Sequence, residues 1–419
     1  MAGTGIRPGL ERIRGLLERM DNPQEGLPVI HVAGTNGKGS TSCIIASVLK
    51  AAGYKVGSFT SPHIHSYQER ITINGKPISG QDFLTCLRKV EAAVGKLLVE
   101  GYERPTEFEV LTAVAFAFFA DQQLDIAVLE AGMGGRYDST NVVHPLLAVI
   151  TRVEFDHTQY LGNTIVEIAY NKAGIIKPGI EVVIGPLRSE ALEVIKTECR
   201  EKSAVLYRAG DHVAVQPTGI STLKGQTVRV SAPYVDPGEV FLSLAGDYQL
   251  ENLKTAMMVL SRLVARGWDL PVSAVKQALG ELTWPGRMEK LSDDPMVVVD
   301  AAHNSDGAKA LARALDSVLP GKSRILVCGV LDDKDGEAIL GSLVSRTRMC
   351  VVTRPESDRA QKWREKTAIA YRLFPRVVEA EDIEQALSTA VNELQREEYI
   401  LVTGSFYLLD RVRRYFTRN

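Results

Sequence analysis

The stretch PVIHVAGTNGKGSTSCIIASVLKAA, residues 28–52, decides the fold of this chain. It starts with an apolar run that predicts a strand, continues with a glycine-rich turn, and ends in a pattern typical of a helix. Glycines allow backbone N–H groups to point inward around an anion, and the N-terminal end of the following helix favours negative charge. The stretch therefore predicts a phosphate loop that holds a triphosphate.

The chemistry of this loop rests on a lysine and a serine. Lys38 can place its charge on the outer phosphates, and the Ser40 hydroxyl can approach a magnesium ion. The nucleotide-binding residues that we expect here are Gly34, Thr35, Asn36, Gly37, Lys38, Gly39 and Ser40. The spacing departs from G-x-x-x-x-G-K-[ST], because a glycine separates the lysine from the serine. An ordinary glycine turn between a strand and a helix is the alternative interpretation.

The variant GTNGKGS resembles the ATP loop of the Mur ligase family, in its folylpolyglutamate synthase and dihydrofolate synthase branch. The resemblance continues, in family order, through the segments SPH, LEAGMGGR, DHTQYLG, NKAG, WPGR and DAAHN. It implies an α/β protein in which residues 1–284 form a P-loop ATPase domain with a mostly parallel sheet. Residues 285–419 would then form a smaller, Rossmann-like α/β ligase domain.

Bulk composition excludes several classes of protein. The chain has 419 residues, a hydrophobic fraction of 45% and a net charge of -2. This length suggests two or three domains, and the charge shows no bias toward nucleic acid. The five cysteines form no C-x-x-C pair, which favours reduced thiols in a cytoplasmic protein, and no apolar run is long enough to span a membrane. We therefore expect neither a nucleic-acid nor a membrane partner.

Polar residues at predicted strand ends suggest a metal site. Glu130 ends the apolar run that starts at Asp125, and a carboxylate at the tip of a parallel strand beside a phosphate loop is placed to hold magnesium. His157 follows the next predicted strand and matches the family's magnesium-binding histidine, and the resemblance also implies Ser61 as a ligand. A plain strand-end acid, a structural histidine and a turn serine are the alternatives.

Lys172, in the segment NKAG, needs a special explanation at such a site. A metal ion would repel its ammonium group, and the resemblance implies carbamylation, which turns a cation into an oxygen ligand. The implied cofactors are ATP and two magnesium ions, with a potassium ion left open. The alternative is a lysine that interacts with the last turn of its helix. Two neighbours depart from the family pattern, namely Tyr137 in place of leucine and Asn171 in place of glutamate.

The resemblance also assigns residues in the C-terminal half. Asn252, near the start of a helix predicted to end at Ala265, would lie near adenine, since an amide offers both a donor and an acceptor; helix capping is the alternative. Arg287 would contact phosphate, Asp300 the ribose and His303 the transfer site. If these assignments hold, ATP lies between the domains.

Local patterns add further structural predictions. The pairs Thr106/Glu109 and Thr164/Glu167 each predict a capping box at the start of a helix. Asn74-Gly75 predicts a two-residue hairpin, and alternation across residues 213–244 predicts antiparallel strands.

The predicted reaction is ATP-dependent ligation of L-glutamate to a folate carboxylate through an acyl phosphate, catalysed by a monomer. Dihydropteroate is a second acceptor on the same reasoning. One alternative is a Mur-type ligase for another acid, although only 33 residues precede Gly34, too few for the nucleotide-sugar domain of cell-wall members. The other is a nucleotide-binding protein without turnover.

Overall fold

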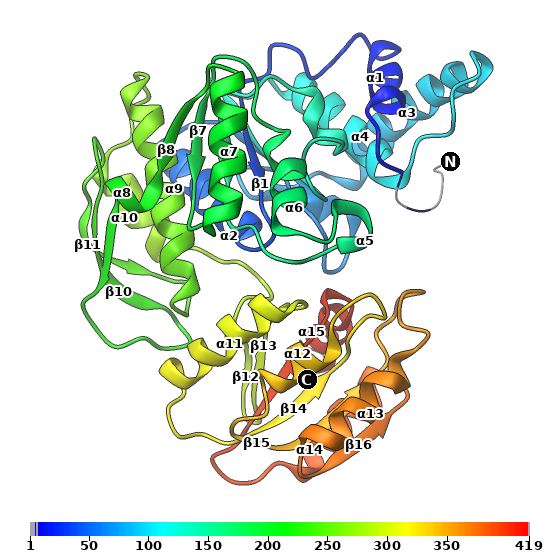
Figure 1. The fold of residues 1–419 in the computed structure, drawn as a ribbon, viewed down its shortest axis with the longest axis vertical. Coiled ribbons are helices and arrows are strands. Elements are labelled where there is room, and N and C mark those ends of the chain that lie inside the picture. Colours follow the sequence, from blue (N-terminus) through cyan, green and yellow to red (C-terminus); the bar gives the residue numbers. More distant parts are fainter. Residues whose placement is uncertain (1–4, 6, 418–419) are drawn as a thin grey trace. The chain divides into compact units, whose positions relative to one another are not determined.

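The computed structural model describes residue 5 and residues 7–417, which divide into two compact units (Figure 1). The first unit contains the chain up to Gln216 together with Arg229–Val240 and Glu251–Gly280. The second contains Pro217–Val228, Phe241–Leu250 and the chain from Glu281 onward. The predicted domain boundary after residue 284 stays a prediction.

An eight-stranded sheet in the order β4-β3-β2-β5-β1-β6-β7-β8 forms the centre of the first unit. Six neighbouring strands are parallel to one another, namely β2, β5, β1, β6, β7 and β8. The strands β3 and β4 add an antiparallel edge. Every residue of β1 and β5 is buried, as expected for central strands of a parallel sheet covered on both faces. The strands are β1 (Val29–Ala33), β2 (Val56–Phe59), β3 (Ile71–Ile73), β4 (Lys76–Pro77), β5 (Ile126–Glu130), β6 (Leu147–Ile150), β7 (Glu181–Ile184) and β8 (Val205–Arg208).

Both predicted capping boxes are present in the helices of this unit. Thr106 accepts a hydrogen bond from the Glu109 backbone N–H at 3.3 Å, and Glu109 accepts one from the Thr106 N–H at 2.7 Å. Thr164 and Glu167 make the same exchange at the start of α6. The helices are α1 (Glu11–Glu18), α2 (Lys38–Ala51), α3 (Gly80–Val99), α4 (Glu107–Gln122), α5 (Thr158–Leu161), α6 (Ile165–Ala173), α7 (Ser189–Glu201), α8 (Ala209–His212) and α10 (Val272–Gly280), with short 3₁₀ turns at Tyr67–Arg70 and Ser139–Val142.

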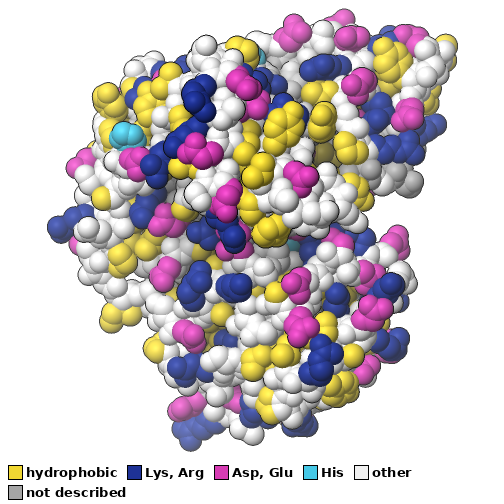
Figure 2. Space-filling model, viewed as in Figure 1, with side chains coloured by type: hydrophobic (Ala, Val, Ile, Leu, Met, Phe, Trp, Pro, Cys, Tyr) yellow, Lys and Arg dark blue, Asp and Glu magenta, His cyan; other side chains and the backbone are white. Residues whose placement is uncertain are grey.

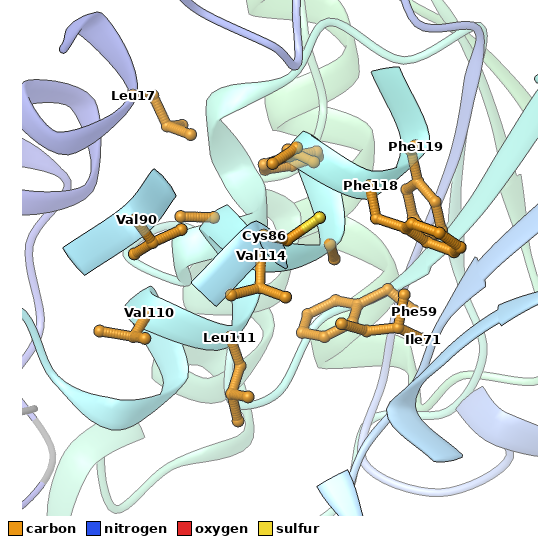
Figure 3. Packing of buried hydrophobic residues seen from close by; sticks show 14 of the residues in the cluster. Leu17, Phe59, Ile71, Cys86, Val90, Val110, Leu111, Val114, Phe118 and Phe119 are labelled. Carbon is orange, nitrogen blue, oxygen red and sulfur yellow. The ribbon is translucent and has the colours of Figure 1, made fainter. Parts of the chain in front are cut away.

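One face of the sheet is covered by a densely packed apolar core (Figure 3). Phe118 and Phe119 of α4 belong to the same buried cluster as Phe59 of β2 and Ile71 of β3. The ring of Phe59 also stacks on Phe108, with centroids 5.6 Å apart. Because α4 is apolar around most of its circumference, it is buried on most sides. It thereby holds in place the strands whose ends carry the candidate site.

Residues from both units contribute to the next elements along the chain. The strand-rich segment predicted for residues 213–244 forms a three-stranded sheet in the order β11-β10-β9. A long helix follows and ends at Ala265, as predicted. These elements are β9 (Ala214–Pro217), β10 (Gln226–Ser231), β11 (Gly238–Leu242) and α9 (Tyr248–Ala265).

The second unit is a six-stranded α/β sheet in the order β12-β13-β17-β14-β15-β16. Only β12 is antiparallel to its neighbour. Its strands are β12 (Glu289–Asp293), β13 (Met296–Val299), β14 (Arg324–Cys328), β15 (Thr347–Thr353), β16 (Val377–Ala380) and β17 (Tyr399–Thr403). Its helices are α11 (Ser305–Val318), α12 (Gly336–Gly341), α13 (Trp363–Leu373), α14 (Ile383–Glu393) and α15 (Leu409–Thr417), with a 3₁₀ turn at Phe406–Leu408.

The structure confirms the α/β class and several local predictions. Asn74 and Gly75, both with positive φ, connect β3 to β4 as the predicted hairpin turn. All five cysteines are free thiols. None of the helices in the described part of the chain is long and apolar enough to cross a membrane.

Candidate active site

The phosphate loop connects β1 to α2 and is held in shape by contacts that only glycine permits. Gly34 and Gly37 have φ angles of 154° and 87°, in the region that favours glycine. A Cβ on Gly34 would overlap the Thr151 hydroxyl, and one on Gly37 would overlap the Asn252 side-chain oxygen. The Thr151 hydroxyl also donates a 2.7 Å hydrogen bond to the Asn36 carbonyl, so the loop is fixed from the tip of β6.

Lys38 is the first residue of α2, and its side chain turns back over the loop. Its Nζ donates to the carbonyls of Gly34 and Thr35 at 3.1 and 3.2 Å. The same Nζ lies 3.9 Å from Glu130 Oε1. Ser40, two residues further along α2, is buried. The structure therefore brings together the lysine and the strand-end carboxylate that the sequence predicted.

Glu130 is the last residue of β5, and 4% of it is exposed. Its Oε2 accepts a 3.4 Å hydrogen bond from the backbone N–H of Ser61, which follows the neighbouring strand β2. Both residues lie at the carboxyl ends of parallel strands, where ligands bind in such sheets.

Asp156 and His157 follow β6 at the same edge of the sheet. His157 adopts a left-handed backbone conformation, with φ 50°, at the start of α5. Asp156 Oδ1 accepts a 2.8 Å hydrogen bond from the His157 N–H and lies 3.9 Å from His157 Nε2. The carboxylate therefore fixes the His157 backbone and lies close to its ring.

Lys172 lies in the last turn of α6 and is almost completely buried, with 2% of it exposed. Its pKa is lowered to about 7, mainly by burial and also by the charge of Lys38, whereas Asp156 and Asp138 act in the opposite direction. An amine with this pKa is substantially neutral at physiological pH. The structure thus gives the unmodified Lys172 a nucleophilic nitrogen.

Asp138 is a buried acid that the sequence analysis did not select. Its carboxylate accepts hydrogen bonds from the Met133 N–H at 2.8 Å, the Thr140 N–H at 3.0 Å and the Thr140 hydroxyl at 2.6 Å. It therefore fixes the glycine-rich loop that follows Glu130. An acid after the sequence GGRY is the only local signal, and it says nothing about which way the side chain points.

The donor set of this edge is compatible with magnesium. Across the described residues, no three side chains of histidine, cysteine, aspartate or glutamate gather in one place. Magnesium at nucleotide sites needs only one or two carboxylates, because waters and phosphate oxygens complete its octahedron. Glu130, beside the hydroxyl-bearing Ser61, satisfies that requirement.

A second group of predicted residues gathers in the second unit around Asp300, which follows β13. Its Oδ2 accepts hydrogen bonds from the Met288 N–H at 2.9 Å and from the Tyr248 hydroxyl at 3.3 Å, and its Oδ1 accepts one from Ala302 at 2.8 Å. Burial raises the pKa of Asp300, and Arg287 acts against this effect. Burial also raises the pKa of the Tyr248 hydroxyl.

Phe406 connects the remaining two predicted residues of this group. The Arg287 guanidinium lies 4.9 Å from the centroid of the Phe406 ring, and the His303 ring lies 6.0 Å from it. His303 Nδ1 is 2.9 Å from the Ala301 carbonyl, which indicates that Nδ1 donates a hydrogen bond to it. No sequence pattern marks Phe406 or Tyr248 as site residues, because aromatic residues in apolar segments are usually core residues.

The other predicted residues are placed as follows. Asn252 lies within α9 and packs against Gly37, so it does not cap the helix. Tyr137 is an exposed residue, and Asn171 donates to the Leu161 carbonyl at 2.9 Å. The hydrogen bond of Asn171 therefore does not involve Lys38 or Glu130.

Two Mur ligase domain families match this chain. The Mur ligase middle domain matches residues 32–260, and the Mur ligase glutamate ligase domain matches residues 286–406. The first match alone covers more than half of the chain. The chain belongs to the Mur ligase family.

Curated relatives define the branch to which this Mur ligase is similar. The dihydrofolate synthase/folylpolyglutamate synthase of Bacillus subtilis is 34% identical over 98% of this chain and 95% of its own length. The folylpolyglutamate synthase of Lacticaseibacillus casei is 35% identical over 96% of this chain and 93% of its own length.

Solved structures agree with these relatives. The Mycobacterium tuberculosis folylpolyglutamate synthase complexed with ADP superposes with a TM-score of 0.92 at 35% identity, over 99% of this chain and 96% of that one. A complex of folylpolyglutamate synthase with AMPPCP and folate superposes with a TM-score of 0.84 at 32% identity, over 99% and 96%. This Mur ligase is thus placed in the folylpolyglutamate synthase and dihydrofolate synthase branch.

Proposed function

We propose that this Mur ligase uses ATP to join L-glutamate to a carboxylate of folate, and that it also converts dihydropteroate to dihydrofolate. One observation carries the proposal: the lysine of a phosphate loop lies 3.9 Å from a buried carboxylate at the carboxyl edge of a parallel sheet. This arrangement is what phosphoryl transfer from a metal-bound triphosphate needs. The similarity to folate-linked ligases supports folate as the acceptor.

Activation of the acceptor carboxylate is the first step. A carboxylate oxygen attacks the γ-phosphorus of ATP, the bond to the β,γ-bridging oxygen breaks, and an acyl phosphate and ADP form. Lys38 contributes positive charge where the transferring phosphoryl group is most negative. The backbone N–H groups of the loop, from Gly34 to Ser40, bind the remaining phosphate oxygens. No covalent bond to the protein is needed.

Residues outside the loop complete the nucleotide site in this proposal. We assign Asn252 to the adenine, Arg287 to phosphate and Asp300 to the ribose. Asn252 packs against the loop at Gly37, which supports a role beside the nucleotide. Residues 1–284 then form the ATP-binding domain, and residues 285–419 form the glutamate ligase domain.

Magnesium would be held by oxygen and nitrogen donors at the carboxyl edge of the first sheet. The ligands that we assign are Ser40, Ser61, Glu130, His157 and Lys172. The bound ions would neutralise phosphate charge and polarise the γ-phosphoryl group. Two ions suit this donor set, and we leave a potassium site open.

Carbamylation of Lys172 would fit its environment. Its neutral amine attacks carbon dioxide, a C–N bond forms, and one proton is lost to solvent, which leaves an anionic carbamate. Burial and the nearby charge of Lys38 both favour the neutral amine that this step requires. The carbamate would add a second anionic oxygen ligand beside Glu130.

Amide formation is the second step. The amine of L-glutamate attacks the acyl carbon, the C–N bond forms, inorganic phosphate leaves, and one proton is released. We assign His303 to this transfer, and the 2.9 Å contact between its Nδ1 and the Ala301 carbonyl supports the role by fixing the orientation of the ring.

We further propose that the protein acts as a monomer in the cytoplasm. The five free thiols are compatible with a reducing compartment.

ADP release with tetrahydrofolate or dihydropteroate as acceptor, each with and without L-glutamate, tests the proposal. Both acceptors should support glutamate-dependent release. Lys38→Ala should abolish it, whereas Lys50→Ala, which removes an exposed lysine from the other end of α2, should not. Release with another carboxylic acid but not with folate would favour a different Mur-type ligase, and no release with any acid would favour a non-catalytic nucleotide-binding protein.

A further inference from the structure

The outer surface of α6 and α7 carries an apolar cavity that the proposed reaction does not use. Its volume is about 450 Å³, and it is lined by Leu161, Gly162, Val166, Glu167, Tyr170, Asn171 and Val194. Val166 and Tyr170 are 48% and 49% exposed. The space-filling view shows hydrophobic side chains gathered over α6 on this face (Figure 2). A mostly apolar pocket of this size can hold one flat ring system against its wall.

Arg136 forms one border of the cavity. Its guanidinium lies 3.9 Å from the centroid of the Tyr170 ring, and its Nη2 lies 2.8 Å from Glu198 Oε2. Glu198 is one helical turn after Val194 on α7, so both residues lie on the same side of that helix. The apolar cavity therefore continues directly into a charged strip.

Lysines extend this strip beyond Arg136. Lys202 Nζ lies 2.6 Å from Glu198 Oε1 and donates to the Ile176 carbonyl at 2.7 Å. Lys177, adjacent in sequence to Ile176, donates to the Asn141 carbonyl at 3.1 Å. We call Arg136, Lys177 and Lys202 the basic strip. Arg136 and Lys202 share one carboxylate, Glu198.

The positive charge of the strip also affects Lys177. The pKa of its amine is lowered to about 8, mainly by burial and also by the charges of Lys202, Arg14 and Arg136. Mutual repulsion of this kind is relieved when an anion binds. The strip is therefore suited to a ligand with several carboxylates.

Glu167 provides an exposed polar group on the wall of the cavity. Its Oε2 accepts the hydrogen bonds of the capping box, from the Asn163 N–H, the Thr164 N–H and the Thr164 hydroxyl at 2.8–3.0 Å. Its Oε1 accepts none from the described residues. An ionised carboxylate in an apolar cavity suits a flat heterocycle that carries amino groups, such as a pteridine.

We propose that the α6–α7 surface, meaning this cavity and the basic strip, is a second binding site for an oligo-γ-glutamyl folate. The pteridine occupies the cavity beside Glu167 and Tyr170, and the glutamyl carboxylates lie along the basic strip. The identity of the ligand rests on the proposed function. Lys172 is buried on the same helix, whereas Val166 and Tyr170 are exposed, so the surface is distinct from the metal site.

Calorimetric titration with pteroyl-tri-γ-glutamate in the absence of ATP tests this proposal. The wild-type protein should bind two equivalents, one at the catalytic site and one at the α6–α7 surface. Val166→Glu places a negative charge on the cavity wall, in the first turn of α6 where an acid is tolerated, and should leave one equivalent. Lys202→Gln should weaken the second site by about tenfold or more.

Lys196→Gln is the matched control, since Lys196 is an exposed lysine of α7 outside the strip, and this variant should bind like the wild type. All three variants should keep normal turnover. One equivalent in the wild type, or two unweakened equivalents in Val166→Glu, would overturn the second site. Absence of turnover in the wild type would instead overturn the proposed function, because the titration does not depend on turnover.

Discussion

Replacing Lys172 by methionine should stabilise the fold while abolishing ligase activity. The lysine is buried in α6, and methionine fills a similar volume without a group that has to be desolvated. In the proposed site the same substitution removes the amine that becomes a metal ligand. A gain in stability with a loss of function is typical of a residue retained for chemistry.

The size and direction of the stability change follow from the pKa of Lys172. Burial lowers it from 10.5 to about 7, and each pH unit corresponds to about 1.4 kcal/mol. Between these two pH values the unfolded chain binds a proton that the folded chain does not, so the wild-type free energy of unfolding rises with pH. Methionine lacks this dependence. The variant should therefore be more stable by up to about 5 kcal/mol below pH 7, and the difference should disappear near pH 10.5.

Urea unfolding at about pH 6, 8 and 10, with carbon dioxide removed from the buffers, measures this difference. Lys196→Met, at an exposed site on α7, is the control and should show no pH-dependent change relative to the wild type. An equal stability difference at all three pH values, or a less stable Lys172→Met at the lowest, would refute the reasoning. Lys172→Arg should also lack ligase activity, because guanidinium cannot form the carbamate.

Three further substitutions test individual contacts. Lys38→Ala should reduce kcat by a factor of 100 or more, on the order of 3 kcal/mol of lost electrostatic stabilisation, with a smaller effect on ATP binding; near-normal kcat would remove the loop from the chemistry. Gly37→Ala should lower the free energy of unfolding measured in urea, and adding Asn252→Ala should recover part of it by removing the overlap with the new methyl group; absence of any recovery would contradict the steric reasoning. Asp300→Asn should lower the free energy of unfolding by roughly 1–3 kcal/mol, measured in urea. The new amide N–H would then face a backbone N–H that now donates to Oδ1 or Oδ2 of the carboxylate. Unchanged stability would contradict the buried network.

Local sequence patterns predicted the parts of the fold whose cause is local. The phosphate loop, the hairpin at Asn74-Gly75 and both capping boxes depend on backbone conformations that a few residues determine. The strand ending in Glu130 was recognisable from its apolar run and final carboxylate, and every residue of β5 is buried.

Other parts of the site depend on contacts between distant segments and had no comparable signal. Thr151 fixes the phosphate loop from 115 residues away in sequence, and Tyr248 reaches Asp300 across 52 residues. Phe406, which is more than 100 residues later in the sequence, has ring contacts with both Arg287 and His303. Such partners are set by sheet order, which a single sequence does not determine.

Isotope transfer tests the central claim most directly. Folate labelled with oxygen-18 in its glutamyl carboxylates is incubated with the enzyme, ATP and L-glutamate, and the released phosphate is analysed by mass spectrometry. An acyl phosphate requires one carboxylate oxygen to leave with the phosphate, so each turnover should deliver one oxygen-18 atom to it. Turnover that yields amide product and unlabelled phosphate would contradict the account.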